Sequence, residues 1–305
     1  MSTTRGLRLG LCCLFVAEPV RFRTTTVQAL SRLSRGEQLA KLSAIGLANA
    51  ENLLLAVQTV QRLGIGAFRI TSPLFPRMTH PTAGYTLEEL PDGAHVRRLL
   101  EQVRKLAAAG GTRLSFHPDQ FVVLSSPRPE VVDSSLRELQ YHGLLAELVG
   151  AETINLHAGG VYGDKQAALD RFRRAFVRLS PQVQRRLSVE NDDRSYTVAD
   201  LLPLSADLRI PLVYDVHHHR CLPDGLSEEQ ATAHARATWE ELGREPYFHV
   251  SSPKAGWGGG DPRPHADYLD PRDFPAGWRG QELTVDVEAK AKELAVLRLQ
   301  AALRR

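Results

Sequence analysis

Short apolar runs of β type alternate with longer helical patterns along this chain, and this alternation limits its fold more than any other feature. The expected strands cover residues 7–14, 67–71, 113–117, 153–157, 186–190, 211–215, 247–251 and 283–288. Helical periodicity covers 37–63, 92–109, 130–149, 165–179, 227–242, a short stretch from 197 and a last helix to about 303. Eight such strands without an internal linker predict an α/β fold, a single (β/α)8 TIM barrel forming one domain over residues 1–305.

An open, doubly wound sheet is the main alternative for a repeated strand–helix pattern. Such a sheet normally carries a glycine-rich phosphate loop directly after its first strand, and no such loop is present here. The glycine-rich segment at residues 256–260 follows the seventh expected strand instead and predicts a long loop. We therefore favour the barrel and expect no nucleotide cofactor.

The amino-acid composition of the chain argues against a membrane protein and against a zinc site made of cysteines. The chain is 43% hydrophobic and 24% charged, as in ordinary globular proteins, and its apolar runs are too short to cross a membrane. Its three cysteines lack zinc-type spacing, which favours free thiols in a reducing compartment. We expect a monomer in the cytoplasm without a membrane partner. The net charge of +3 permits a polyanionic partner but does not require one.

Six consecutive expected strands each deliver a histidine or a carboxylate at or near their C-terminal ends. These residues are His117, His157, Glu190, Asp215 with His218 close behind, His249 and Glu288. The C-terminal ends of barrel strands converge on one mouth, so we expect a metal cluster there. A ligand set of imidazoles and carboxylates that contains no cysteine is suited to Zn²⁺ or Mn²⁺. Seven candidate ligands are more than one tetrahedral ion can bind. Two or three ions that share bridging carboxylates would use them all, and such a cluster could bind a phosphodiester from both sides.

Each of these residues has a plainer interpretation when taken alone. His157 could be a structural histidine, Glu190 could cap a turn, and Glu288 could favour the start of the last helix. Taken together, however, these interpretations require six costly polar groups to gather at one end of a barrel by accident. The set as a whole therefore indicates a metal site.

Three histidines follow one another at positions 217 to 219 and cannot all point inward. The spacing from Asp215 favours His218 as the ligand, with His217 and His219 behind the ligands or at the surface. His265, on the loop after the seventh strand, could complete a third ion site with His218.

The motifs resemble those of the UV damage endonuclease family over essentially the whole chain, with endonuclease IV as a more distant relative. The matching stretches lie near residue 8 and at 68–76, 116–121, 128–132, 156–160, 189–193, 215–219 and 287–293. The resemblance implies three ion sites: His117, His157 and Glu190; Glu190, Asp215, His249 and Glu288; and His218 with His265. It also implies catalytic roles for Glu190, Asp215 and Glu288, with Mn²⁺ expected first and Zn²⁺, Mg²⁺ or Co²⁺ as alternatives.

The same resemblance implies the substrate, which is UV-damaged double-stranded DNA cut immediately 5′ to the lesion. Lesions would include cyclobutane pyrimidine dimers, 6-4 photoproducts and abasic sites. Gln120 and Phe121 match a polar–aromatic pair pushed into the duplex at the lesion. A wedge between bases must overcome unstacking, which costs less where damage has weakened pairing. Without the resemblance, Phe121 would be expected to pack in the barrel mouth.

Cations near the strand ends are candidates for phosphate contacts. They are Arg21, Arg23, Arg69 and Lys254, with Arg263 as a further candidate. The chain also departs from the family pattern, because Leu11, Leu14 or Phe15, Phe121 and Tyr247 stand where many relatives carry Tyr, Asn, Tyr and Lys. These differences leave the ligand set intact but put the details of lesion contact in question.

Two other functions fit parts of the pattern. A sugar isomerase would use divalent ions in the same mouth but needs a small closed pocket rather than an exposed wedge. A non-catalytic module for damaged DNA would have no need of a complete ligand set. Incision of irradiated DNA distinguishes the endonuclease from both.

Overall fold

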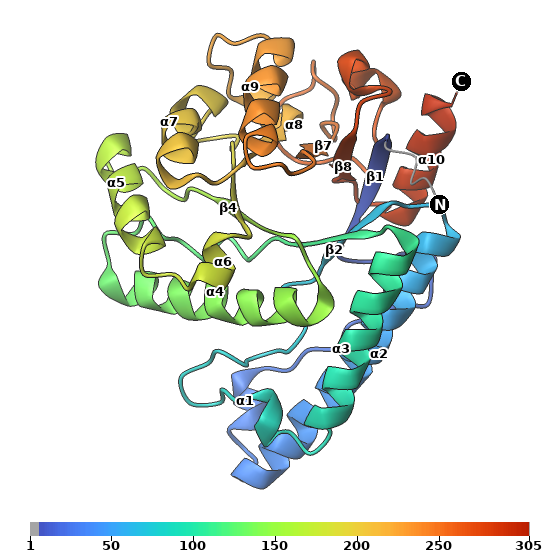
Figure 1. The fold of residues 1–305 in the computed structure, drawn as a ribbon, viewed down its shortest axis with the longest axis vertical. Coiled ribbons are helices and arrows are strands. Elements are labelled where there is room, and N and C mark those ends of the chain that lie inside the picture. The colour runs from blue at the N-terminus through green and yellow to red at the C-terminus, as the bar shows by residue number, and fades with distance from the viewer. Residues whose placement is uncertain (1–5, 305) are drawn as a thin grey trace.

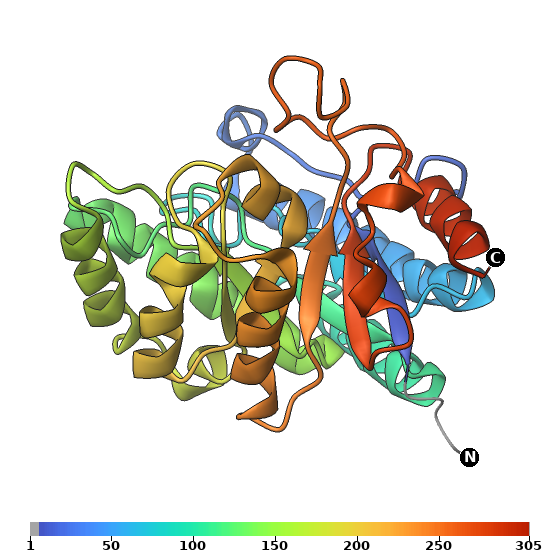
Figure 2. The same ribbon diagram turned by 90° about the horizontal axis from the view of Figure 1, so that it is seen from above.

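The computed structural model describes residues 6–304, so both ends of the 1–305 range predicted as one domain lie outside the described residues. Eight parallel strands follow one another in chain order and close into one barrel, with β8 paired to β1 (Figures 1 and 2). The strands are β1 Leu7–Cys12, β2 Ala67–Ile70, β3 Arg113–Phe116, β4 Thr153–His157, β5 Leu187–Glu190, β6 Leu212–Asp215, β7 Tyr247–Val250 and β8 Leu283–Val287. The (β/α)8 TIM barrel predicted from the alternation is confirmed.

Helices surround the barrel on its outside (Figure 1). They are α1 Val27–Leu30, α2 Arg35–Arg62, α3 Gly93–Gly110, α4 Pro129–Val149, α5 Lys165–Phe176, α6 Pro181–Gln184, α7 Val198–Leu208, α8 Val216–Cys221, α9 Glu228–Glu240 and α10 Glu293–Leu303, with short 3₁₀ turns at Leu87–Glu89, Pro271–Asp273 and Ala276–Trp278. The long helices begin and end within a few residues of the predicted bounds. The short helices α1, α6 and α8 were not predicted, because four to six residues are too few for helical periodicity to show. Between residues 6 and 304, no helix is both long and apolar enough to cross a membrane.

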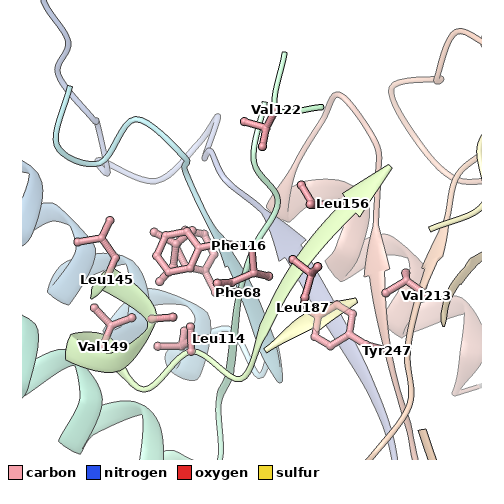
Figure 3. Packing of buried hydrophobic residues seen from close by; sticks show 14 of the residues in the cluster. Phe68, Leu114, Phe116, Val122, Leu145, Val149, Leu156, Leu187, Val213 and Tyr247 are labelled. Atoms are coloured by element: carbon pink, nitrogen blue, oxygen red, sulfur yellow. The ribbon is translucent and has the colours of Figure 1, made fainter. Parts of the chain in front are cut away.

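The apolar core lies between the outer wall of the barrel and the helices. Phe68 on β2 and Phe116 on β3 point out of the barrel, and Figure 3 shows them beside Leu145 and Val149 of α4. Alternate side chains of a strand point to opposite faces, so one face of each strand supplies this core. The other face lines the inside of the barrel.

The inner wall of the barrel is unusually polar. Arg113 donates to the hydroxyl of Thr284 (2.9 Å), and the Tyr247 hydroxyl donates to Asp286 (2.9 Å) and lies 3.1 Å from the Ser115 hydroxyl. Branched apolar residues usually fill this space in TIM barrels. Here a hydrogen-bonded network rises from the bottom of the barrel toward the mouth.

Candidate active site

The C-terminal ends of the strands surround an open cavity of about 410 Å³ at the barrel mouth. Its lining includes Arg69, His117, Gln120, His157, Glu190, His218 and Glu288, together with Cys13, Pro118 and Asp119. These side chains come from β2, β4 and β5 and from the segments that follow β1, β3, β6 and β8. The topology therefore brings together most of the metal-type residues predicted from the sequence.

Glu190, at the end of β5, is the centre of this arrangement and is 1% exposed. One carboxylate oxygen lies 3.0 Å from His249 Nδ1 and 3.4 Å from His218 Nδ1. The other lies 3.0 Å from His117 Nε2 and 4.0 Å from His157 Nε2. A single carboxylate thus faces four imidazoles from four parts of the chain, as a bridging ligand would.

Two groups of side chains have ligand atoms close enough to share an ion. His117, His157 and Glu190 form one group, and Glu190, Asp215 and His218 form the other; within each group the atoms lie within 4.8 Å of one another. Two buried atoms of these residues, His157 Nδ1 and Asp215 Oδ2, have no hydrogen-bond partner. Buried polar atoms are costly without a partner, and this donor set suits Zn²⁺ or Mn²⁺. The residues therefore fit divalent ions.

Glu288 follows β8 on the other side of the mouth. Its carboxylate lies 3.5 Å from His249 Nδ1 and 3.6 Å from His265 Nδ1. It also pairs with the Arg69 guanidinium at 2.6 Å. His265 thus lies beside Glu288, whereas its ring centroid is 6.4 Å from that of His218, its expected partner in a third site.

Arg69, which the sequence groups with phosphate-contacting cations, is instead 8% exposed. Besides pairing with Glu288, it donates to Asp286 (3.0 Å) and lies 2.9 Å from His249 Nε2. Its inward position on β2 explains the difference, because inner-wall carboxylates already take up its charge. Asp286 in turn requires Gly10 on β1, since a Cβ there would lie 2.0 Å from its Oδ1.

The electrostatics of the mouth keep the carboxylates ionised. Burial alone would raise the pKa of Glu190, but His249 and His157 outweigh it and hold that pKa well below its usual range. Burial likewise opposes ionisation of Glu288, and Arg69 and His249 lower its pKa. Burial lowers the pKa of His157 to about 4, so its ring is neutral at pH 7. Burial opposes protonation of His218 and His249, but Asp215 and Glu190 raise the pKa of His218, and Glu190 raises that of His249. Because metals bind neutral imidazole, ion binding at these two residues would release protons.

His217 and His219 were predicted to lie behind the ligands or at the surface, and the surface alternative is wrong for both. His219 is 4% exposed, with ring nitrogens 2.6 Å from the Tyr214 hydroxyl and 3.3 Å from Asp224. His217 is fully buried. Helix α8 begins directly after β6, so the three histidines lie on a helix and not on a strand. Their side chains therefore do not alternate between two faces, and both His217 and His219 are buried.

The loop after β3 carries the predicted wedge residues. Gln120 is exposed at the edge of the mouth cavity, and Phe121 is 77% exposed. Phe121 also borders a second cavity of about 480 Å³ that Phe75 and Tyr141 help to line. Packing of Phe121 inside the barrel mouth is therefore ruled out.

The exposed cations Arg21, Arg23 and Lys254 lie on the segments after β1 and β7. The segment after β1 is anchored by the buried Glu293 of α10, whose carboxylate accepts three consecutive backbone N–H groups, from Val16 to Glu18. Arg263, the further candidate, pairs with Asp261 at 2.7 Å. Arg21, Arg23 and Lys254 are thus exposed, although the Arg21 guanidinium donates to the Glu18 and Val20 carbonyls at 2.7 Å.

The departures from the family pattern have different surroundings. Leu11 is fully buried, and Phe15 is 6% exposed with its ring 5.7 Å from that of Phe68. Leu14 is 48% exposed. Tyr247 is held in the inner wall by Asp286 and Ser115. Leu11, Phe15 and Tyr247 therefore belong to the interior and not to the exposed rim.

Sequence reasoning missed two inner-wall residues that support the mouth. Asn155 donates a hydrogen bond to Glu190, and Asp286 binds Arg69. Asn155 lies two positions before His157, the last residue of β4, and Asp286 lies two positions before Glu288, which directly follows β8. Because strand side chains alternate with a period of two, stepping back two residues from each ligand would have found both.

Comparison with known proteins agrees with this geometry. The family model described as UV-endonuclease UvdE matches residues 7–305. The chain belongs to this family.

Individual members of the family match over most of this chain. The UV DNA damage endonuclease of Bacillus velezensis is 33% identical over 303 residues, covering 96% of this chain and 92% of its own length. The UV-damage endonuclease of Schizosaccharomyces pombe is 36% identical over 291 residues; the match covers 91% of this chain but only 46% of the longer fungal protein.

Solved structures superpose on this barrel over nearly its whole length. The crystal structure of SacUVDE superposes with a TM-score of 0.85 at 29% identity and covers 98% of both chains. Endonuclease IV from Thermus thermophilus superposes with a TM-score of 0.61 at 18% identity, covering 97% of this chain and 99% of its own. The latter likeness shows a shared fold, as the sequence motifs predicted.

Proposed function

We propose that this protein nicks damaged double-stranded DNA at the phosphodiester immediately 5′ to a UV lesion, by hydrolysis that depends on several divalent ions. The lesions would be cyclobutane pyrimidine dimers and 6-4 photoproducts, and abasic sites as well. The observation that carries the proposal is the convergence of imidazoles from four parts of the chain on Glu190 at an open barrel mouth.

The ligand assignment follows from the groups at the mouth. The first site would comprise His117, His157 and Glu190, the second Glu190, Asp215, His249 and Glu288, and the third His218 and His265. Mn²⁺ is the ion that we expect first. Divalent ions bound there would supply a hydroxide nucleophile at neutral pH and Lewis acidity toward the phosphodiester.

The chain's own groups prepare the site for this chemistry. Glu190, Asp215 and Glu288 are the proposed catalytic carboxylates. Arg69 holds Glu288 and His249 from below, supported by Asp286. With fixed partners, these groups need little rearrangement when substrate arrives, which is a requirement for efficient electrostatic stabilisation.

Recognition of damage would use the exposed loop after β3. Phe121 projects into solvent beside the mouth, and Gln120 borders the cavity that holds the ligands. Insertion of this pair between bases costs less at a lesion than in intact duplex, which provides selectivity. Arg21, Arg23 and Lys254 would contact phosphates beside the mouth.

We further propose that residues 1–305 act as one domain and as a monomer in the cytoplasm. One barrel contains all eight proposed ligands, so no second copy is needed to complete the site.

The decisive experiment is incision of an end-labelled duplex containing one pyrimidine dimer, with Mn²⁺ and with chelator. We expect one metal-dependent nick directly 5′ to the dimer, leaving a 3′-hydroxyl and a 5′-phosphate. Binding to irradiated DNA without a nick under any divalent ion would instead favour a recognition module. Isomerisation of sugars by the metal-loaded protein, with DNA left intact, would favour the sugar-isomerase alternative.

A further inference from the structure

The loop after β3, residues 117–128, has an exposed tip and a buried base. Residues 119–121, which include the proposed wedge pair, are exposed, whereas Val122 and residues 124–126 are buried. Val122 belongs to the apolar core (Figure 3). The tip can therefore move relative to the barrel mouth only as far as the contacts of the base allow.

Ser125 joins the base of this loop to the strand that carries a proposed ligand. It is fully buried. Its hydroxyl donates to the Ala158 carbonyl at 2.6 Å, and Ala158 directly follows His157, the last residue of β4. Its own carbonyl accepts from Arg171 Nε on α5 at 2.7 Å. One residue of the loop is thus held from two sides, by the end of β4 and by α5.

The packing around Ser125 leaves little room for the loop to shift. A Cβ on Gly159 would lie 2.6 Å from both Ser125 Oγ and Val123 Cγ1, and Gly159 has a φ of +89°. The Val123 N–H donates to the Ser135 hydroxyl on α4 at 2.8 Å. The base of the loop is therefore in direct contact with the segment after β4 and is tied to α4 as well.

Arg171 is bound to the loop and not to an acid. On the same helix, Arg173 pairs with two aspartates, at 3.0 and 2.8 Å. For Arg171, within residues 6–304, the structure shows the hydrogen bond to the Ser125 carbonyl and a cation–π contact with Tyr162 at 5.6 Å, and no ion pair. A hydrogen bond from an ionised donor is stronger than one between neutral groups, so Arg171 holds the loop firmly.

We propose that Arg171 and Ser125 are positioning residues, which hold the loop after β3 at a fixed distance from the end of β4 and thereby determine which phosphodiester is cut. The inference rests on the proposed function, in which Phe121 marks the lesion and ions beside His157 take part in cleavage. Successive phosphates of one strand are about 3.4 Å apart along the duplex axis. A loop displaced by that distance would select the neighbouring phosphodiester.

The experiment maps the nick on an end-labelled duplex containing one pyrimidine dimer, using the full chain with Mn²⁺. R171M removes the hydrogen bond to Ser125, and S125A removes the one to Ala158. We expect both variants to cut at two or more adjacent phosphodiesters, where the wild type cuts at one. The rate should also fall about tenfold, because a misplacement of about 1 Å can cost up to about 100-fold.

Three controls separate positioning from a general loss of structure. R171K, whose ammonium can still donate to the Ser125 carbonyl, should restore the single nick. R174M, which removes an exposed arginine from the same helix, should cut as the wild type does. Bound metal is counted in every preparation, because loss of an ion would slow incision without moving the nick. Arg171 is partly exposed, so R171M carries the test if S125A does not fold.

Hydrogen–deuterium exchange of the metal-free protein tests the same contacts without DNA. The N–H groups of Val122 and Val123 donate to the Asp119 carbonyl and to the Ser135 hydroxyl, so their exchange reports on the loop. Because local opening sets the exchange rate, we expect residues 117–128 to exchange about tenfold faster in R171M and S125A than in the wild type and R174M.

The outcomes for positioning and for function are separable. If folded R171M and S125A cut only the phosphodiester 5′ to the dimer, at the wild-type rate, the inference is overturned and the proposed function stands. If the wild type binds irradiated DNA without cutting it, the proposed function fails. Faster exchange in the two variants would then still support the positioning of the loop, and unchanged exchange would overturn it.

Discussion

Asn155 donates a side-chain hydrogen bond to the Glu190 carboxylate from a position two residues before His157 on β4. Ser188, two residues before Glu190 on β5, donates in turn to the Asn155 amide oxygen at 3.0 Å. The central carboxylate of the mouth is thus held by a chain of hydrogen bonds from within the barrel, which fixes the direction of its oxygens.

Asn155→Ala should weaken ion binding without removing any proposed ligand. Loss of the amide leaves Glu190 free to turn, and removal of a group that orients a ligand typically lowers metal affinity about 10- to 100-fold. Calorimetric titration of the metal-free protein with Mn²⁺ measures the effect. Asn52→Ala removes an amide on α2 that accepts from the Arg21 backbone and contacts no proposed ligand. This control should bind Mn²⁺ as wild type does; equal affinities for both variants would contradict the orienting role.

Glu190→Gln should abolish incision of dimer-containing DNA and lower the number of bound ions. A neutral amide bridges two cations poorly, and the loss should exceed about 100-fold in rate. Incision assays and metal analysis on the same preparation check both effects. Glu147→Gln changes a carboxylate on the outer helix α4 and serves as the control. A Glu190→Gln protein that still cuts at wild-type rate would refute the bridging assignment.

Phe121→Ala should reduce discrimination between damaged and intact duplex while leaving ion content unchanged. The side chain is 77% exposed, so its loss should not disturb the fold. Since unstacking costs a few kcal/mol, we expect the ratio of binding to damaged and intact DNA to fall about tenfold. Competition binding measures this ratio. Val177→Ala, an exposed apolar residue after α5, is the matched control; a parallel loss of bound metal in Phe121→Ala would contradict the wedge role.

The pH dependence of stability should report on His142, which packs against Phe116 and Tyr141. Burial lowers its pKa from the ordinary 6.5 to about 4. The unfolded chain therefore takes up a proton at higher pH than the folded one. Stability from this group is complete above about pH 6.5 and is lost as the pH falls toward 4.

For His142 this loss amounts to about 2 kcal/mol between about pH 7 and pH 5. Urea unfolding of the metal-free protein at both pH values measures it. His142→Gln keeps a polar group beside the Glu138 carbonyl, which the ring contacts at 2.7 Å, but cannot take up a proton. We expect this variant to lose less stability on acidification than wild type; an identical loss would show that His142 does not carry the effect.

Much of the fold and of the mouth could be predicted from the sequence, because both follow from periodic patterns. Strand periodicity indicated the barrel, and the convergence of strand ends placed Glu190 among histidines from distant parts of the chain. The position of Arg69 could not be predicted in this way, since its partners Asp286 and Glu288 are remote in sequence and meet it only when β8 closes against β1. The orientations of His217 to His219 also escaped prediction, because they depend on where α8 begins after β6.

The inner wall of the barrel is polar and its outer face is apolar, so successive residues of a strand have different roles. On β3, Ser115 faces the network that leads to the mouth, and the next residue, Phe116, faces the helices. Adjacent residues of one strand therefore meet different requirements, one for hydrogen bonding in the interior and one for apolar packing against the helices. Protein design could therefore raise the stability of this barrel by changing the outward-facing residues of its strands, while leaving the inward-facing residues unchanged.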